Sequence, residues 1–277
     1  MAFIFLEFAN LRKKLLIITN VFAKKLPIFT LNKHFVLAYT FRNGLIEQIL
    51  DETPNVKRFF IRIPELKSFD FNAGQFVMLD LPIHSKITNR AYSIASAPGS
   101  DNLVELVVVL KDGGLGTSYL FGEIKEGSSI KISDPIGKFT RPRPIRFEDP
   151  LCFICTGTGI APFRSMIHDI LNHAVPFHSI HLIKGSRLPT DILYKTEMEE
   201  LSNKISNFHF YPILSRAENH DWSGHRGYVH ELYPEIAKNF PQTLFYICGW
   251  KEMIFQTKQN LLDLGIPKEK IRFEVYD

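Results

Sequence analysis

The stretch LCFICTGTGIAPFRSM, residues 151–166, carries the residue types and spacing best suited to chemistry at a nucleotide. An apolar run ends at Thr156, Gly157-Thr158-Gly159 follows, and an amphipathic pattern begins after it. Glycines at such a turn let the backbone approach a pyrophosphate, and a helix that starts there offers free N–H groups and the positive end of its dipole. The stretch therefore predicts a dinucleotide-binding loop.

This loop departs from the dinucleotide fingerprint G-x-G-x-x-G, because Pro162 replaces the third glycine. Proline suits the first turn of a helix, where no N–H donor is needed, so phosphate binding does not require that glycine. Taken alone, a G-x-G after a strand is an equally good sign of a tight turn. The loop also lies past the middle of the chain, although such folds usually open with it. The first half of the chain must hold something else.

The segment after residue 150 alternates between strand-like and helix-like runs. Strands are predicted at 151–156, 179–185, 208–215, 243–249 and 271–277, with helices at 162–173, 194–204, 229–238 and 251–265. This alternation predicts a five-stranded parallel sheet covered by helices on both faces.

The segment before it carries β signals. The runs RAYSIAS, NLVELVVVL and SIKISDPI are separated by turn-forming clusters, and one short helix is expected at 117–124. These features predict an antiparallel barrel. We expect a basic N-terminal extension at 1–38, a β-barrel at 39–142 and an α/β domain at 143–277.

Reactive or ligand-binding residue types follow every predicted strand of the parallel sheet. They are Thr156 to Gly159, Ser186 with Arg187, Ser215 with Arg216, Cys248 with Gly249, and Glu274 to Tyr276. In open α/β sheets ligands bind outside the carboxyl ends of the strands. The gathering of these groups at one edge is the strongest physical evidence for a binding site in this sequence.

The first half supplies two more blocks, Arg90-x-Tyr92-Ser93 on a predicted strand and Gly116-Thr117-Ser118 before the predicted helix. Together with residues 157–165, Cys248-Gly249 and the closing Glu-Val-Tyr, they resemble the ferredoxin–NADP reductase family, whose motifs occur in this order. The resemblance covers about residues 40–277. It implies a Greek-key FAD-binding barrel followed by an NADP-binding α/β domain, which explains why the nucleotide loop comes late.

The resemblance assigns FAD to two blocks: Arg90, Ala91, Tyr92 and Ser93, and Gly116, Thr117 and Ser118. It implies that Arg90 pairs with the flavin phosphates, because a planar guanidinium matches phosphate oxygens. Tyr92 would stack on the isoalloxazine, and Ser93 would form a hydrogen bond near the flavin N5. The N–H groups of the second block would hold the pyrophosphate. Ordinary barrel packing is the structural alternative for Tyr92.

The resemblance assigns NADP(H) to Thr156, Gly157, Thr158, Gly159, Ser186, Arg187, Ser215, Arg216, Arg226, Cys248 and Gly249, and it assigns Tyr276 to the flavin. The catalytic group that it implies is Ser93, Cys248, Glu274 and Tyr276. Cys248 would lie beside the nicotinamide, Glu274 would orient or protonate groups there, and Tyr276 would stack on the flavin. A small core residue is the structural alternative for Cys248.

The implied reaction is hydride transfer between NADPH and FAD, with single electrons passing to or from a ferredoxin or flavodoxin, because flavin can do both. Cationic loops favour NADP(H), but they also resemble reductases that use NADH, so NAD(H) stays open. Two other functions remain: the NAD(P)H-dependent reductase component of a multicomponent oxygenase, and a flavin-binding electron-transfer subunit that does not turn over NADPH alone.

Charge and cysteine content exclude other classes. Residues 1–38 hold six Lys/Arg and one Glu, whereas the rest of the chain is near neutral, so net charge gives no argument for nucleic acid. The apolar stretch at 15–23 is too short to span a membrane, and surface contact by the extension is the less favoured alternative. Three cysteines indicate a reducing, cytoplasmic setting. Cys152 and Cys155 would point to opposite faces of a strand, so we expect no metal site.

Overall fold

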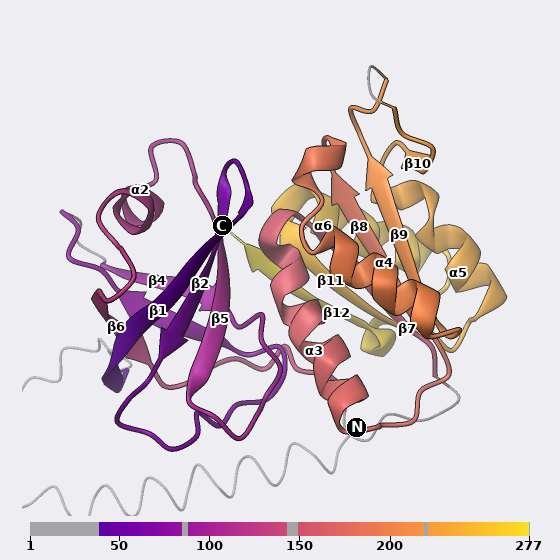
Figure 1. Ribbon diagram of the computed structural model, residues 1–277. Coiled ribbons are helices and arrows are strands. Elements are labelled where there is room, and N and C mark those ends of the chain that lie inside the picture. Colours follow the sequence, from indigo (N-terminus) through magenta and orange to yellow (C-terminus); the bar gives the residue numbers. More distant parts are fainter. Residues whose placement is uncertain (1–38, 85–87, 143–148, 219–220, 277) are drawn as a thin grey trace, which may run out of the picture. The chain divides into compact units, whose positions relative to one another are not determined.

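The computed structural model describes residues 39–84, 88–142, 149–218 and 221–276 (Figure 1). The extension expected at 1–38 and the last residue of the strand expected at 271–277 lie outside the described residues. Within them, no helix is both long and apolar enough to cross a membrane.

The first sheet is antiparallel and contains β1 (Phe41–Thr53), β2 (Val56–Arg62), β3 (Phe76–Asp80), β4 (Asn89–Ser93), β5 (Leu103–Val109) and β6 (Ser129–Ser133). Its strand order is β4-β3-β6-β1-β2-β5. The two ends of this order meet, because Ile94 bridges Leu106 and the Ala95 N–H donates to the Glu105 carbonyl at 2.8 Å. The sheet thus closes on itself, which confirms the predicted barrel.

The barrel core follows from alternation along the strands. In β2, Phe59 and Ile61 are buried, whereas Arg58 and Phe60 between and beside them are partly exposed. Helix α2 (Leu115–Gly122), close to the helix expected at 117–124, adds Leu120 to the same core.

The second sheet is parallel and contains β7 (Leu151–Thr156), β8 (Ile180–Ser186), β9 (Phe208–Leu214), β10 (His225–Arg226), β11 (Leu244–Trp250) and β12 (Ile271–Tyr276). Its order is β10-β9-β8-β7-β11-β12. Five of these strands were expected. The sixth, β10, has two residues and is too short to leave a hydrophobic pattern in the sequence.

Helices cover both faces of this sheet: η1 (Gly157–Ile160), α3 (Ala161–Asn172), η2 (Pro189–Asp191), α4 (Lys195–Lys204), η3 (Val229–Glu231), α5 (Tyr233–Asn239), α6 (Lys251–Asp263) and η4 (Lys268–Lys270). In Figure 1, α3 and α4 lie on the near face, and α5 and α6 on the far face. The helix expected at 229–238 is split, because Pro234 in the first turn of α5 has no N–H to continue η3.

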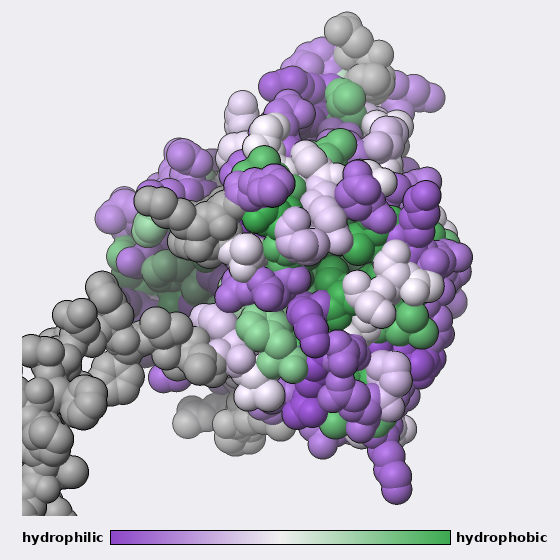
Figure 2. Space-filling model, turned by 90° about the vertical axis from the view of Figure 1, so that its left-hand side faces the viewer, coloured by the Kyte–Doolittle hydropathy of each residue, from purple (hydrophilic) through white to green (hydrophobic). Residues whose placement is uncertain are grey.

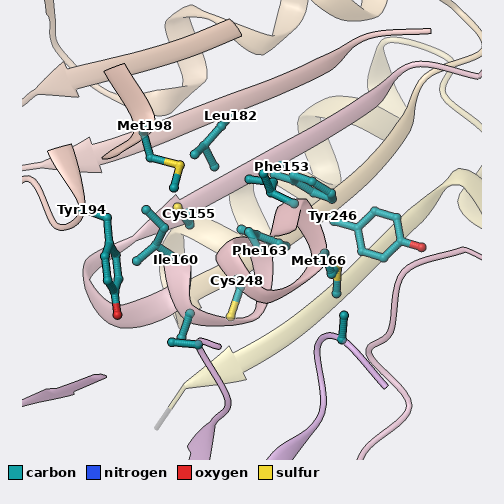
Figure 3. Packing of buried hydrophobic residues seen from close by; sticks show 14 of the residues in the cluster. Phe153, Cys155, Ile160, Phe163, Met166, Leu182, Tyr194, Met198, Tyr246 and Cys248 are labelled. Atoms are coloured by element: carbon teal, nitrogen blue, oxygen red, sulfur yellow. The ribbon is translucent and has the colours of Figure 1, made fainter. Parts of the chain in front are cut away.

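The core of this half centres on β7, which is buried on both faces. Phe153 stacks on Phe163 with ring centroids 4.8 Å apart, and Tyr246 packs against Phe153 from the side (Figure 3). Cys152 and Cys155 belong to the clusters on opposite faces of the sheet, as expected for residues three apart in a strand.

Apolar residues also reach the surface, but not as one continuous area. On the face drawn in Figure 2, green hydrophobic residues are interrupted by purple hydrophilic ones. Scattered exposed apolar residues of this kind are normal for folded proteins.

Replacing Phe163 with Ala is expected to lower the free energy of unfolding by about 3–5 kcal/mol, because the ring is fully buried and its loss leaves a cavity. Urea titration of the variant measures this. The matched control is Phe255→Ala on α6, where the ring is 45% exposed, with an expected change of about 0.5 kcal/mol or less. Equal losses in the two variants would contradict the assigned core.

Candidate functional site

The carboxyl edge of the parallel sheet is held together by a close backbone approach. A Cβ on Gly159 would lie 2.4 Å from the Cys248 carbonyl oxygen, and a Cβ on Gly249 would lie 2.4 Å from Thr156 Oγ1. The Trp250 N–H also donates to Thr156 Oγ1 at 3.2 Å. The loop after β7 and the end of β11 therefore interlock in a way that only glycines allow.

The two glycines of the predicted phosphate loop have different tasks. Gly157 adopts a left-handed φ of 53°, and the space around its Cα is open, so a ligand can approach there. Gly159 is buried against Cys248 and is needed for packing. Thr158, between them, is partly exposed and accepts the Ala161 N–H with its carbonyl. The prediction that Gly159 faces the pyrophosphate stays a prediction, because this contact concerns only the side on which a Cβ would lie.

The four predicted catalytic residues come together where β4 of the barrel meets the edge strand β12. Ser93 Oγ donates to Glu274 Oε2 at 3.3 Å, across 181 residues of sequence. Glu274 is the register partner of Cys248 on β11, and Cys248 is the partner of Cys155 on β7.

Burial sets the protonation of this group. Burial raises the pKa of Glu274 to about 7, and the Ser93 hydrogen bond opposes this only in part. Burial, with the Glu274 charge added, also raises the pKa of Cys248 well above its ordinary value. A neutral thiol therefore lies beside a carboxyl group that can take up or release a proton near neutral pH.

Tyr276 completes the group. Its ring is partly exposed and packs against the cluster that contains Cys248. Its hydroxyl is buried near Ser93 and Cys248 but makes no hydrogen bond of normal geometry. A buried phenol with no partner among the described residues fits a site completed by a bound group.

The predicted FAD residues also lie together. A Cβ on Gly116 would come within 3.0 Å of Arg90 Cγ, so the arginine stem lies against the start of α2. Arg90 donates to the Asn89 carbonyl at 2.9 Å. The first N–H groups of a helix have no partner within it, and a guanidinium beside them suits a pyrophosphate.

Ser118 does not match its predicted role. Its N–H donates to the Gly114 carbonyl at 2.9 Å as the first bond of the helix, so the N–H groups of residues 115–117 are the ones that can face a phosphate. The Thr117 hydroxyl holds the preceding loop, because it accepts from the Lys111 N–H at 3.1 Å.

Along β4, Arg90 and Tyr92 share one face, and Ala91 and Ser93 share the other. Burial raises the pKa of Tyr92 to about 12, and the positive charge of Arg90 partly offsets it. Ala91 is exposed, whereas Ser93 is 6% exposed. A half-buried tyrosine beside Arg90 is suited to stacking on a planar ligand.

The loops after β8 and β9 lie side by side. The Ser215 N–H donates to the Ser186 carbonyl at 3.0 Å, and the Arg216 N–H donates to the Arg187 carbonyl at 3.0 Å. Arg187 and Arg216 are both exposed. Two exposed arginines with neighbouring backbones therefore lie at the carboxyl edge, where a phosphate could bind.

Arg226, predicted to lie near the adenosine ribose, also holds its own loop. Its guanidinium donates to the Ala217 carbonyl at 2.7 Å and to the Trp222 carbonyl at 2.6 Å. It therefore ties together the ends of the loop that follows Arg216, and because Arg226 is exposed, its remaining N–H donors can still face a ligand.

A buried charged group that was not predicted from the sequence includes Glu105 of β5 and Arg164 of α3, which pair at 2.8 Å. One signal was present: Glu105 interrupts the apolar run LVELVVV, where a carboxylate is costly unless it is paired.

Comparison with known proteins decides the family. The family described as Oxidoreductase FAD-binding domain matches residues 44–140, and the one described as Oxidoreductase NAD-binding domain matches residues 153–259. Ferredoxin--NADP reductase B of Sorangium cellulosum is 34% identical over 232 residues, which cover 81% of this chain and 93% of that protein. This chain belongs to the ferredoxin–NADP reductase family. It is an FAD-dependent oxidoreductase with binding domains for FAD and for a nicotinamide dinucleotide.

Other relatives within this broad group differ in size. The reductase component of phenol 2-monooxygenase from Pseudomonas sp. (strain CF600) is 33% identical over 214 residues, but this chain covers 58% of its length. A ferredoxin NADP+ reductase from Neisseria gonorrhoeae, solved with bound FAD and NADP, superposes with a TM-score of 0.70 and 30% identity, covering 85% of this chain and 98% of that one.

The raised pKa of Glu274 predicts a pH-dependent stability. The fold favours the neutral form of Glu274. The contribution of this group to the free energy of unfolding is therefore full below the ordinary pKa of 4.5 and is lost as the pH rises through about 7. The total is about 1–3 kcal/mol. Chemical denaturation between pH 4.5 and 8 measures it, and Glu274→Gln should remove it. Glu123→Gln, at an exposed glutamate, is the control; the same pH slope in both variants would refute the assignment.

Proposed function

We propose that this protein transfers a hydride between NADPH and FAD and passes single electrons to or from a ferredoxin or flavodoxin. The observation that carries the proposal is the contact of Ser93 with Glu274. It joins β4 of the barrel half to β12, the last strand of the nucleotide half, with Cys248 alongside. The relative from Sorangium cellulosum, named as a ferredoxin–NADP reductase, supports the same function.

The chain's own residues have distinct tasks in this reaction. Bound FAD would supply the conversion between a hydride and single electrons. Arg90 and the start of α2 would hold its phosphates, and Tyr92 would stack on its ring. Glu274 would hold or release a proton at its carboxyl oxygen, and Ser93 would orient that carboxyl group. The Cys248 side chain, fully buried, would form a dry wall of the site.

The preference for NADPH rests on the exposed pair Arg187 and Arg216. A phosphate on the adenosine ribose would make charge-assisted hydrogen bonds there, whereas NADH has no such group. Ser186 and Ser215 would add hydroxyl groups at the same edge. The Neisseria gonorrhoeae relative was solved with NADP, which supports this preference.

The reductase component of an oxygenase is the second candidate, favoured by the 33% identity to the phenol 2-monooxygenase component. Both candidates reduce a small electron carrier. We also propose the domain bounds 39–142 and 143–277, within which both family matches fall. A cytoplasmic location is proposed because the three cysteines are free thiols.

The deciding experiment begins with the purified protein. The extracted flavin is expected to be FAD, and an anaerobic absorbance titration is expected to show reduction by NADPH at lower concentration than by NADH. The reduced protein is then mixed with ferredoxin, with flavodoxin, or with the oxygenase component of a phenol hydroxylase. Extraction of FMN alone, or no reduction by either nucleotide, would overturn the proposal. Reoxidation by the oxygenase component alone would select the second candidate.

The Arg216→Ala variant is expected to lose preference for NADPH over NADH, mainly through a higher KM for NADPH. A charge-assisted contact to phosphate contributes about 1.5–3 kcal/mol, which corresponds to about ten- to a hundredfold in affinity. Steady-state kinetics with both nucleotides test this. Lys204→Ala, at an exposed lysine that ends α4, is the control. If the ratio of kcat/KM values is unchanged in Arg216→Ala, this arginine does not select the phosphate.

The Tyr276→Ser variant is expected to bind the nicotinamide ring more readily and to discriminate less against NADH. The buried hydroxyl makes no hydrogen bond of normal geometry, so the main loss is stacking worth about 0.5–1.5 kcal/mol. The flavin–nicotinamide charge-transfer band measures the effect. The control is Tyr228→Ser, where the ring is 65% exposed. An unchanged band in Tyr276→Ser would mean that this ring does not cover the flavin.

A further inference from the structure

A buried group of charged side chains joins the barrel to helices α3 and α4. Its members are Glu52 of β1, Arg58 of β2, Glu105 of β5, Arg164 and His168 of α3, Tyr194, and Glu197 of α4. None of the roles described above for cofactor, nucleotide or catalysis uses these residues.

Glu105 is the centre of this group. It is 3% exposed, and its carboxylate accepts hydrogen bonds from Arg58 at 2.6 Å, from Arg164 at 2.8 Å and from the Tyr194 hydroxyl at 2.8 Å. Arg58 lies on the barrel, whereas Arg164 and Tyr194 lie on the other half. One carboxylate therefore binds donors from both halves at once.

Tyr194 is held rigidly between the two arginines. The Arg58 and Arg164 guanidinium carbons lie 4.9 and 4.6 Å from its ring centroid. Its backbone has a left-handed φ of 54°, uncommon for a residue other than glycine, and its N–H donates to Glu52 Oε1 at 2.5 Å. A strained, fully bonded residue at this point indicates a geometry that is held in place rather than loosely packed.

Arg164 connects this group to the catalytic strand. Its Nη1 also donates to the Ala95 carbonyl at 2.9 Å, two residues after Ser93, and its Nε is shared by both oxygens of Glu197 at 2.9 Å. Arg164 lies on the helix that begins directly after the Gly157–Ile160 turn. A single guanidinium thus contacts the segment that carries Ser93 and belongs to the helix that follows the nucleotide loop.

We propose that Arg164 and Glu105 are positioning residues, which set the distance between the flavin side and the nucleotide side of the site. The proposal rests on the proposed function, because it assigns these residues to the hydride-transfer step. A buried ion pair is often replaceable by apolar residues without loss of stability, so stability alone does not explain it. Its directed hydrogen bonds fix an arrangement that apolar packing would leave less defined.

The test compares three forms of the full-length, FAD-loaded protein: Arg164→Gln, Arg164→Lys, and the control Arg42→Gln, which breaks an arginine–carboxylate pair inside the barrel half. In stopped-flow mixing with NADPH, Arg164→Gln should reduce its flavin about ten- to a hundredfold more slowly, with KM for NADPH little changed. Arg164→Lys should recover part of the rate, and Arg42→Gln should match the wild type.

A second readout does not depend on turnover. Hydrogen–deuterium exchange of Arg164→Gln should become faster at residues 93–97 and at the start of α3, whereas Arg42→Gln should not change there. Normal exchange and a normal reduction rate in Arg164→Gln would overturn the proposal. A wild-type protein that is not reduced by NADPH would refute the proposed function instead, and the exchange comparison would still decide whether Arg164 holds the two segments together.

A second variant tests the proposal if Arg164→Gln does not fold. Helix α3 keeps the Arg141–Asp169 ion pair when Arg164 is replaced. If Arg164→Gln does not fold, the double variant Arg164→Met/Glu105→Leu removes both charges, and Arg58 keeps Glu52 as a partner. This variant should fold and retain FAD but reduce it slowly. Reduction at the wild-type rate would contradict the positioning role.

Discussion

The arrangement of the barrel and the parallel sheet depends on the hydrogen bonds that the Glu105 carboxylate accepts. It is almost fully buried, and its charge is tolerated only because Arg58, Arg164 and Tyr194 donate to it. Removing one partner of such a group typically costs about 3–5 kcal/mol, because the remaining charge stays buried. Since the donors come from both halves of the chain, the Glu105 carboxylate links the barrel to the α/β half.

The site itself depends on close packing. Gly159 and Gly249 let the loop after β7 lie directly against β11, which leaves Cys248 fully buried. The same burial raises the pKa of Glu274 to about 7 and keeps the Cys248 thiol neutral. Geometry and protonation at this edge therefore have one cause, the exclusion of water from the place where β4 meets β12.

Two motif residues form hydrogen bonds that shape the backbone around the site. Arg226 binds the carbonyls of its own loop, and Ser118 forms the first hydrogen bond of α2. Motif residues thus differ in how many of their donors the protein already uses: Arg226 binds two backbone carbonyls, whereas Arg187 and Arg216 are exposed. The difference is visible only where hydrogen-bond partners are known.

The sequence by itself determined the two folds, because hydrophobic period and turn residues are local properties: the barrel and five parallel strands were predicted, as was the gathering of motif residues at one edge. It could not determine the contacts that join the halves. Ser93 and Glu274 are 181 residues apart, and nothing local in LVELVVV says which cations pair with Glu105. The raised pKa of Glu274 and the task of Gly159 likewise depend on neighbours distant in sequence. Only the tertiary structure decided these, since desolvation and pairing energies exist only after the chain has folded.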